Sequence, residues 1–169
     1  MASELHVDAI KHSGGTSALT INSSGSVNIP GSIIQVVQGT QGGVANFSSS
    51  SYAASSLDLD FTPKFATSKV FIQCNFSVDT QASGRQFYAT IYRDSTRLDS
   101  VTLGGSYGFA TSYEAGDRQI NTLSAMVLDS PNTTSTIHYE LYCRSANSSQ
   151  VQMSSQSVTA IMICMEVAQ

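Results

Sequence analysis

The chain has 169 residues, of which 12% are charged, and its formal net charge is −4. This length suits one domain with a core of its own and a short appendage, and it is too short for two domains of ordinary size. The eight basic residues are scattered, which argues against nucleic acid as a partner, because phosphate binding requires clustered Lys and Arg.

The first 31 residues are predicted to be an appendage without a core. Three short β-like stretches, 5–10, 18–22 and 26–29, are separated by Ser-Gly turns. Strands this short become stable when copies from neighbouring subunits wind together, or when they lie on another protein. We therefore predict an anchoring or oligomerisation segment, 1–31, that ends at Pro30-Gly31 and precedes a head domain, 32–169. The candidate anchoring residues are Leu5, Val7, Ile10, Leu19 and Ile21.

From Ser32 onward the sequence predicts one strand after another and no helix. Apolar and polar residues alternate most clearly over 69–79 and 136–144, as in half-buried antiparallel strands. The predicted strands are 33–38, 57–61, 69–79, 86–93, 97–103, 119–128, 136–144, 151–154 and 158–167. About nine short strands with turns between them predict an all-β antiparallel β-sandwich of the jelly-roll type.

The last predicted strand, 158–167, is apolar on both faces. A central strand covered on one side by the opposing sheet and on the other by a neighbouring subunit satisfies this pattern. Loops that fold over a central strand are the alternative. The candidate oligomer interface consists of Ile161, Ile163, Met165 and Val167. The longest apolar run, 160–165, is far too short to span a membrane, and we expect no membrane insertion.

The motifs that could indicate catalysis lack their required context. Gly104 to Gly108 match G-x-S-x-G around Ser106, but a hydrolase needs this motif between a strand and a helix of an α/β chain. A Gly-rich loop is the better interpretation. The carboxylate pairs Asp58 with Asp60, and Glu114 with Asp117, are interpreted as solvated loop charges rather than an acid/base pair or a calcium loop.

No metal or cofactor site is expected. Cys74, Cys143 and Cys164 lack a zinc-ligand spacing and fall within apolar strand patterns, so they are predicted to be reduced, buried thiols. The histidines have no partner at a ligand spacing, which favours surface or interface roles. An axial ion held by symmetry copies of His6 or His12 stays open; His138 falls on the polar side of a strand.

Four aromatic residues are candidates for receptor contact. They fall among glycines and serines in predicted loops, and this mixture suits contact with carbohydrate or protein because aromatic rings stack while hydroxyls adapt. The alternative is that these aromatics fold back over the sandwich. The four residues are Tyr52, Tyr107, Phe109 and Tyr113.

A collinear set of motifs resembles short phage virion proteins and fibre tips. The motifs are 3–10, 14–21, 31–38, 62–70, 92–94, 129–134 and 165–167. Each motif alone is a turn or a strand fragment, but together they are distributed along almost the whole chain in the same order. The resemblance implies a trimeric head similar to tumour-necrosis-factor-like and complement-type globular domains.

The resemblance also implies a function. The first hypothesis is a non-enzymatic, trimeric tail-fibre or receptor-binding protein that is attached through residues 1–31 and touches host surface polysaccharide or protein. The second is a trimeric capsid decoration or cement protein. A polysaccharide-degrading enzyme is disfavoured because no paired carboxylates mark a cleft. The expected partners are other copies of the chain and other virion proteins, at the surface of a phage particle assembled in the host cytoplasm.

Overall fold

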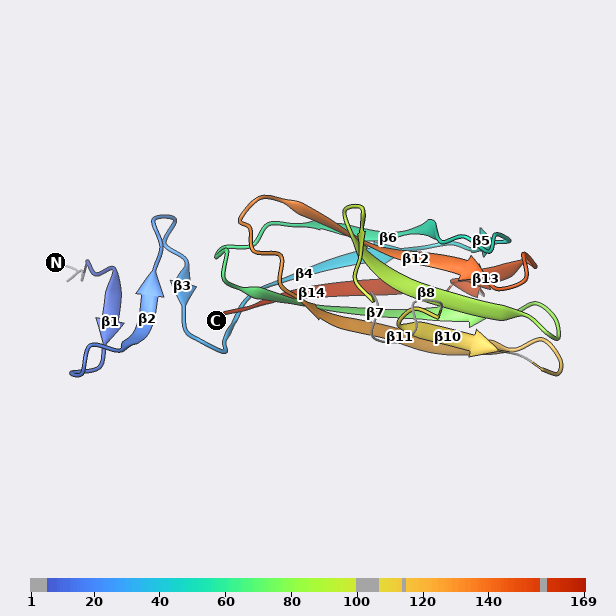
Figure 1. Cartoon of the computed structure of the whole chain (residues 1–169), viewed down its shortest axis with the longest axis horizontal. Helices are drawn as coiled ribbons and strands as arrows, with labels where there is room; N and C mark the ends of the chain where they lie inside the picture. The colour runs from blue at the N-terminus through green and yellow to red at the C-terminus, as the bar shows by residue number, and fades with distance from the viewer. Residues whose placement is uncertain (1–5, 100–106, 114, 156–157) are drawn as a thin grey trace.

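The computed structural model describes residues 6–99, 107–113, 115–155 and 158–169. In these ranges the chain forms a small N-terminal sheet followed by a two-layered β-sandwich (Figure 1). None of the helical structure within them is long and apolar enough to cross a membrane.

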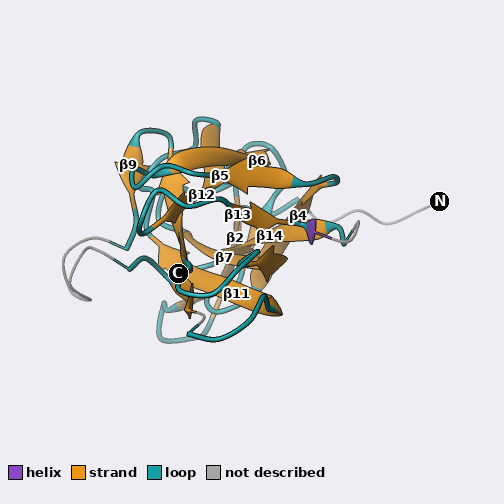
Figure 2. Cartoon of the chain, turned by 90° about the vertical axis from the view of Figure 1, so that its right-hand side faces the viewer, coloured by secondary structure: helices purple, strands orange, loops and turns teal. Residues whose placement is uncertain are grey.

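Antiparallel pairing joins the strands of each sheet. The N-terminal sheet contains β1 (Ala9–Lys11), β2 (Ser17–Ile21) and β3 (Val27–Asn28). The first layer contains β4 (Ile33–Gln41), β14 (Ala160–Val167), β7 (Lys69–Asp79) and β11 (Ile120–Asp129), extended by β5 (Ala45–Phe47) and β13 (Val151–Met153). The second layer contains β6 (Ala53–Phe61), β12 (Ile137–Ser145), β8 (Gln86–Arg93) and β10 (Ala110–Tyr113), with β9 (Thr96–Arg97) paired to β8. Figure 2 shows the two layers along the long axis.

The two layers have the strand order of a jelly roll. The first layer runs β4-β14-β7-β11, and the second runs β6-β12-β8-β10. The chain therefore passes from one layer to the other at every connection between these strands except β8 to β10. This crossing pattern is that of a double-sheet jelly roll. The predicted all-β sandwich with jelly-roll topology is confirmed.

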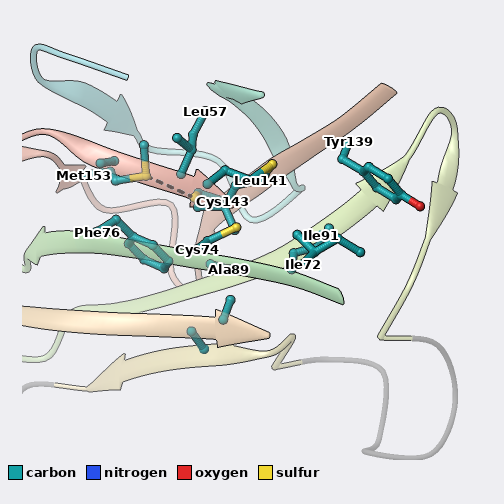
Figure 3. Packing of buried hydrophobic residues seen from close by; sticks show 14 of the residues in the cluster. Leu57, Ile72, Cys74, Phe76, Ala89, Ile91, Tyr139, Leu141, Cys143 and Met153 are labelled. Carbon is teal, nitrogen blue, oxygen red and sulfur yellow. Dashed lines mark hydrogen bonds between the residues drawn. The ribbon is translucent and has the colours of Figure 1, made fainter. Parts of the chain in front are cut away.

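The core forms because alternate residues of each strand point between the layers. Figure 3 shows Ile72, Cys74 and Phe76 of β7 facing Leu141 and Cys143 of β12. Burial of such side chains stabilises the fold by about 1.5–3 kcal/mol for each large aliphatic or aromatic residue. Cys74, Cys143 and Cys164 are all free and buried, as predicted, and burial raises the pKa of the Cys164 thiol to about 12.

A buried carboxylate closes the end of the sandwich nearest to the N-terminal sheet. The Glu166 carboxylate accepts hydrogen bonds from the backbone N–H groups of Lys64 (2.9 Å) and Phe65 (3.0 Å), and from the Gln35 side chain (2.6 Å). Fixed donors of this kind compensate for the loss of water around a buried charge. Gln35, Lys64 and Glu166 belong to the motifs 31–38, 62–70 and 165–167. Three of the motifs that carry the resemblance are therefore in contact in the fold.

A second contact joins the motifs 92–94 and 129–134. The Arg93 guanidinium donates to Asp129 at 2.9 Å, and the Tyr139 hydroxyl donates to the same carboxylate at 2.7 Å. Asp129 is 8% exposed, so both bonds lie in a partly dry environment. The motifs 92–94 and 129–134 therefore also supply contacts between strands.

The strands differ from the prediction in three places. Strand β10 lies in the segment that was predicted to be a loop, and the short β5 was not predicted at all. The strand predicted at 97–103 is wrong for Leu98 and Asp99, because β9 ends at Arg97, and residues 100–103 lie outside the described residues. Gly108 leads into β10 with a φ of +75°, and a Cβ on it would lie 2.2 Å from the Ala89 carbonyl oxygen. Glycine therefore permits the close approach that starts β10.

Candidate functional site

The outer face of the first layer carries nine apolar side chains among polar ones. Met165 pairs with Val36 on one side and with Phe71 on the other. Phe71 in turn pairs with Leu128, and directly paired residues point to the same face, so a row of four apolar side chains crosses the layer. In the next row Ile163 lies between two glutamines and Met126 follows. The name "apolar face" is used below for Ile33, Val36, Phe71, Met126, Leu128, Ile161, Ile163, Met165 and Val167.

The apolar face is exposed to an unusual degree for large side chains. Ile33 and Val36 are each 57% exposed, Met126 is 53% exposed and Leu128 is 52% exposed. Four strands by four rows cover roughly 500 Å², given the usual spacings of strands and residues in a sheet. The same rows also contain the polar residues Gln38, Thr40, Lys69, Gln73, Asn75 and Ser124. The apolar part of the block is therefore roughly 300 Å². The largest apolar patch on a typical monomer is about 300–600 Å² and often marks an interaction site.

All four predicted interface residues, Ile161, Ile163, Met165 and Val167, lie on the apolar face. Each is half-buried, whereas Ala160, Met162 and Cys164 on the other side of β14 are buried in the core. The strand lies between β4 and β7. The division of these residues between two faces, inferred from the sequence, is therefore correct, and the contact with another subunit stays a prediction.

The predicted anchoring residues fall on the small N-terminal sheet. Ile10, Leu19 and Ile21 lie on β1 and β2, and Ile10 is 48% exposed. Val7 comes just before β1 and is exposed. Leu5 lies outside the described residues.

The predicted receptor-contact residues separate into two groups. Tyr107 and Tyr113 are 57% and 60% exposed, but Tyr113 lies on strand β10 and not in a loop. Phe109 is partly buried and packs against the core, and its backbone N–H donates to the Ala89 carbonyl at 2.8 Å. Tyr52 is half-buried. For Phe109 and Tyr52 the alternative in which aromatics fold back over the sandwich is the better description.

Two arginines that the sequence did not single out cover the second layer. The Arg97 guanidinium lies 4.6 Å above the Tyr52 ring. The Arg144 guanidinium lies 5.2 Å above the same ring and 4.3 Å above the Tyr88 ring. The Tyr107 ring follows, 5.4 Å from that of Tyr88. Burial raises the pKa of both Tyr52 and Tyr88. The alternation of β12 places Arg144 on the outer face and was the signal available in the sequence.

The other polar candidates have local partners or fall outside the description. The His138 Nδ1 lies 2.8 Å from the Asp60 carboxylate, and this hydrogen bond raises the pKa of the imidazole. The His12 Nδ1 accepts a hydrogen bond from the Gly14 N–H. Within the described ranges no three His, Cys, Asp or Glu side chains are grouped as metal ligands. Ser106 and Glu114 lie outside those ranges.

Comparison with known proteins shows no family for this chain. No protein-family model matches the chain, and no curated protein is significantly similar to it. A chain in the solved structure of infectious bursal disease virus, Gt strain, is similar with a TM-score of 0.41 and 11% identity, over 96% of this chain and 43% of that one. A chain from the Gx strain gives a TM-score of 0.36 and 12% identity, over 96% and 45%. The chain thus spans less than half the length of either viral chain.

Proposed function

We propose that this chain is a non-enzymatic structural protein of a phage virion and that it assembles as a homotrimer through the apolar face. The exposed apolar face is the observation that carries the proposal. Removing apolar area from water contributes about 25 cal/mol per Å², so burying this face in a contact between subunits contributes favourably to association. The collinear motifs that resemble phage virion proteins support the placement on a particle.

A rotation axis parallel to the long axis of the sandwich suits this chain. The N-terminal sheet extends from one end of the sandwich along that direction (Figure 1). A parallel axis keeps every N-terminal segment at the same end, where the segments attach to one part of the particle. A twofold axis across the strands would place them at opposite ends.

A trimer of this kind turns the second layer outward. Tyr107 and Tyr113, both more than half exposed, then face the surroundings. Exposed tyrosines bury large area at low conformational cost when they bind, which suits contact with host polysaccharide or protein. We therefore place the chain among tail-fibre or receptor-binding proteins of the virion.

The oligomeric state tests the proposal directly. Light scattering on the full chain should give three times the 17.9 kDa chain mass. Ile163→Asp should be folded and monomeric, because a buried contact cannot accommodate an unpaired charge. Met126→Lys changes a residue that is already 53% exposed in the single chain, and it should dissociate the trimer without disturbing the fold.

Thr111→Asp is the matched control, since it adds the same charge to an exposed position on β10 of the second layer. It should stay trimeric. A wild-type chain that is monomeric or dimeric, or a folded Ile163→Asp that is still trimeric, would contradict the proposal.

Incorporation into particles tests the role of the N-terminal segment. A chain that lacks residues 1–30 keeps Gly31, whose N–H donates to the Ala168 carbonyl at 2.9 Å, and should be absent from purified virions. Normal incorporation would place the anchor elsewhere. The copy number of the full chain per virion separates the tail from the capsid: a few copies are expected at a tail, and many copies would indicate a capsid decoration protein.

A further inference from the structure

The outer side of the second layer carries a cluster of aromatic rings and arginines. Two guanidinium groups lie over the Tyr52 ring, with Arg97 at 4.6 Å and Arg144 at 5.2 Å from its centroid. Arg144 also lies 4.3 Å from the centroid of the Tyr88 ring, and the Tyr107 ring lies 5.4 Å from that of Tyr88. The name "arginine–tyrosine patch" is used below for these five residues.

The patch exposes positive charge in an acidic chain. Arg97 forms an ion pair with Asp99, but the Asp99 side chain is only 1% exposed, whereas that of Arg97 is 25% exposed. Arg144 adds a second, partly exposed guanidinium. The chain as a whole has a net charge of −4. Solvent at the patch therefore meets cationic side chains, and these complement an anionic ligand.

Acidic side chains of this layer lie away from the patch, at the other end of β12. Glu140 pairs with Asp58, and His138 pairs with Asp60. Glu140 comes four residues before Arg144 on β12, which corresponds to about 13 Å along a strand. An anionic ligand is therefore attracted to the arginine end of the layer and repelled from the other end.

The side chains around the patch fit a polysaccharide better than a protein. Among the described outward positions of β6, β8, β10 and β12 there is no Val, Leu, Ile or Met, whereas the centre of a protein contact is usually apolar. Tyr107 is 57% exposed, and the C–H groups of a sugar ring pack well on an aromatic face because that face carries partial negative charge. Thr111, which pairs with Tyr88, adds a hydroxyl beside the patch.

We propose that the arginine–tyrosine patch binds an acidic polysaccharide: Tyr107 stacks on a sugar ring, Arg144 donates to a carboxylate of the polysaccharide, and Arg97 adds positive charge beside it. A guanidinium presents paired N–H donors that match the geometry of a carboxylate. Stacking on Tyr52 and Tyr88 orients both arginines before the ligand arrives, which lowers the entropic cost of binding. This inference rests on the proposed receptor-binding role and names the class of ligand for it.

Calorimetric titration of the full chain tests the patch. Sodium alginate and polygalacturonate, two acidic polysaccharides, should bind, and neutral dextran should not. The affinity for the acidic polysaccharides should fall when the NaCl concentration is raised from about 0.05 M to about 0.5 M, because salt screens exposed charges. Equal affinity for dextran, or no binding of either acidic polysaccharide, would overturn the proposal.

Two substitutions locate the binding site. Arg144→Gln and Tyr107→Ala should each weaken alginate binding about tenfold, because each removes one direct contact with the ligand. Lys11→Gln is the matched control for Arg144→Gln: it removes the same charge from an exposed position on the N-terminal sheet and should leave the affinity unchanged. Tyr107→Ala changes an exposed side chain and stays informative if Arg144→Gln disturbs the fold. Unchanged affinity in both variants would place the ligand elsewhere and overturn the proposal.

Two further measurements separate the inference from its alternatives. An oligothymidylate that binds as tightly as alginate would indicate a site for polyanions in general and would overturn the assignment to polysaccharide. Light scattering on the same samples reports the oligomeric state independently, since the patch lies within one chain. Trimeric protein that binds no acidic polysaccharide would overturn the patch and leave the proposed trimer intact, whereas monomeric protein that binds alginate would overturn the trimer alone.

Discussion

The two outer faces of the sandwich differ in how their large side chains are covered. On the second layer the chain covers its own aromatics: Arg144 lies over the ring of Tyr88, which is only 5% exposed. On the first layer Val36 and Leu128 are more than half exposed. The second layer thus covers Tyr88 by interactions within the chain and leaves Tyr107 and Tyr113 exposed. The first layer presents aliphatic area that a contact between copies would bury.

The largest effect is expected from substitutions that compare the core side of β14 with its outer side. Met162→Ala removes a fully buried side chain and should lower the free energy of unfolding by about 2–5 kcal/mol, because it leaves a cavity in the core. Met165→Ala changes the apolar face and should mainly weaken the trimer. Chemical denaturation, together with light scattering over a range of protein concentrations, measures both. An equal loss of stability in the folded monomer would show that Met165 belongs to the core.

A smaller loss of stability is expected when a buried tyrosine hydroxyl is removed, and almost none when an exposed one is removed. Tyr139→Phe removes the hydrogen bond to Asp129 and should lower the free energy of unfolding by about 1.5–3 kcal/mol, since the acceptor is a partly buried carboxylate. Tyr113→Phe, on the exposed face of β10, should change it by less than about 0.5 kcal/mol. Urea denaturation of the two variants provides the comparison. Equal effects would mean that the Asp129 contact adds no stability.

The arginine that lies over the aromatic rings of the second layer should contribute about 1 kcal/mol to the free energy of unfolding. Arg144→Gln removes the guanidinium that stacks on Tyr52 and Tyr88, and each such contact stabilises by about 0.5–2 kcal/mol when partly desolvated. The tyrosine rings should at the same time become more exposed to solvent. Tyrosine fluorescence measures this change, and no tryptophan interferes with the signal. Unchanged stability and fluorescence would mean that this face is not held by the arginine.

The smallest effect should be the pH dependence at His138. Its hydrogen bond with Asp60 raises the pKa of the imidazole in the folded state. The contribution to stability is therefore complete below the unfolded pKa of about 6.5 and is lost as the pH rises through the folded value. In Asp60→Asn an NMR titration should show a lower His138 pKa. The pH dependence should become smaller, because Asp58 and Glu140 also raise this pKa and remain in the variant. An unchanged titration would assign the shift to other neighbours.

The sequence determined the fold class and much of the candidate surface. Alternation in β7 and β12 predicted which residues enter the core, because the side-chain period of a strand is fixed. The same rule placed Ile161, Ile163, Met165 and Val167 on the face opposite the core. It did not predict β10, because that strand depends on a close approach of Gly108 to Ala89 across the layer.

Only the tertiary structure decided which residues of different strands lie side by side on the outer face of the first layer. Val36, Phe71 and Leu128 lie far apart in the sequence, and the register of β4, β7, β11 and β14 brings them into one row with Met165. Strand pairing between distant segments is not encoded in any local pattern, so neither the full extent of the apolar face nor the stacking of Arg144 on Tyr88 could be located from the sequence. The sequence by itself determined that one strand is apolar on both sides, and the pairing of four strands made that strand the centre of a surface.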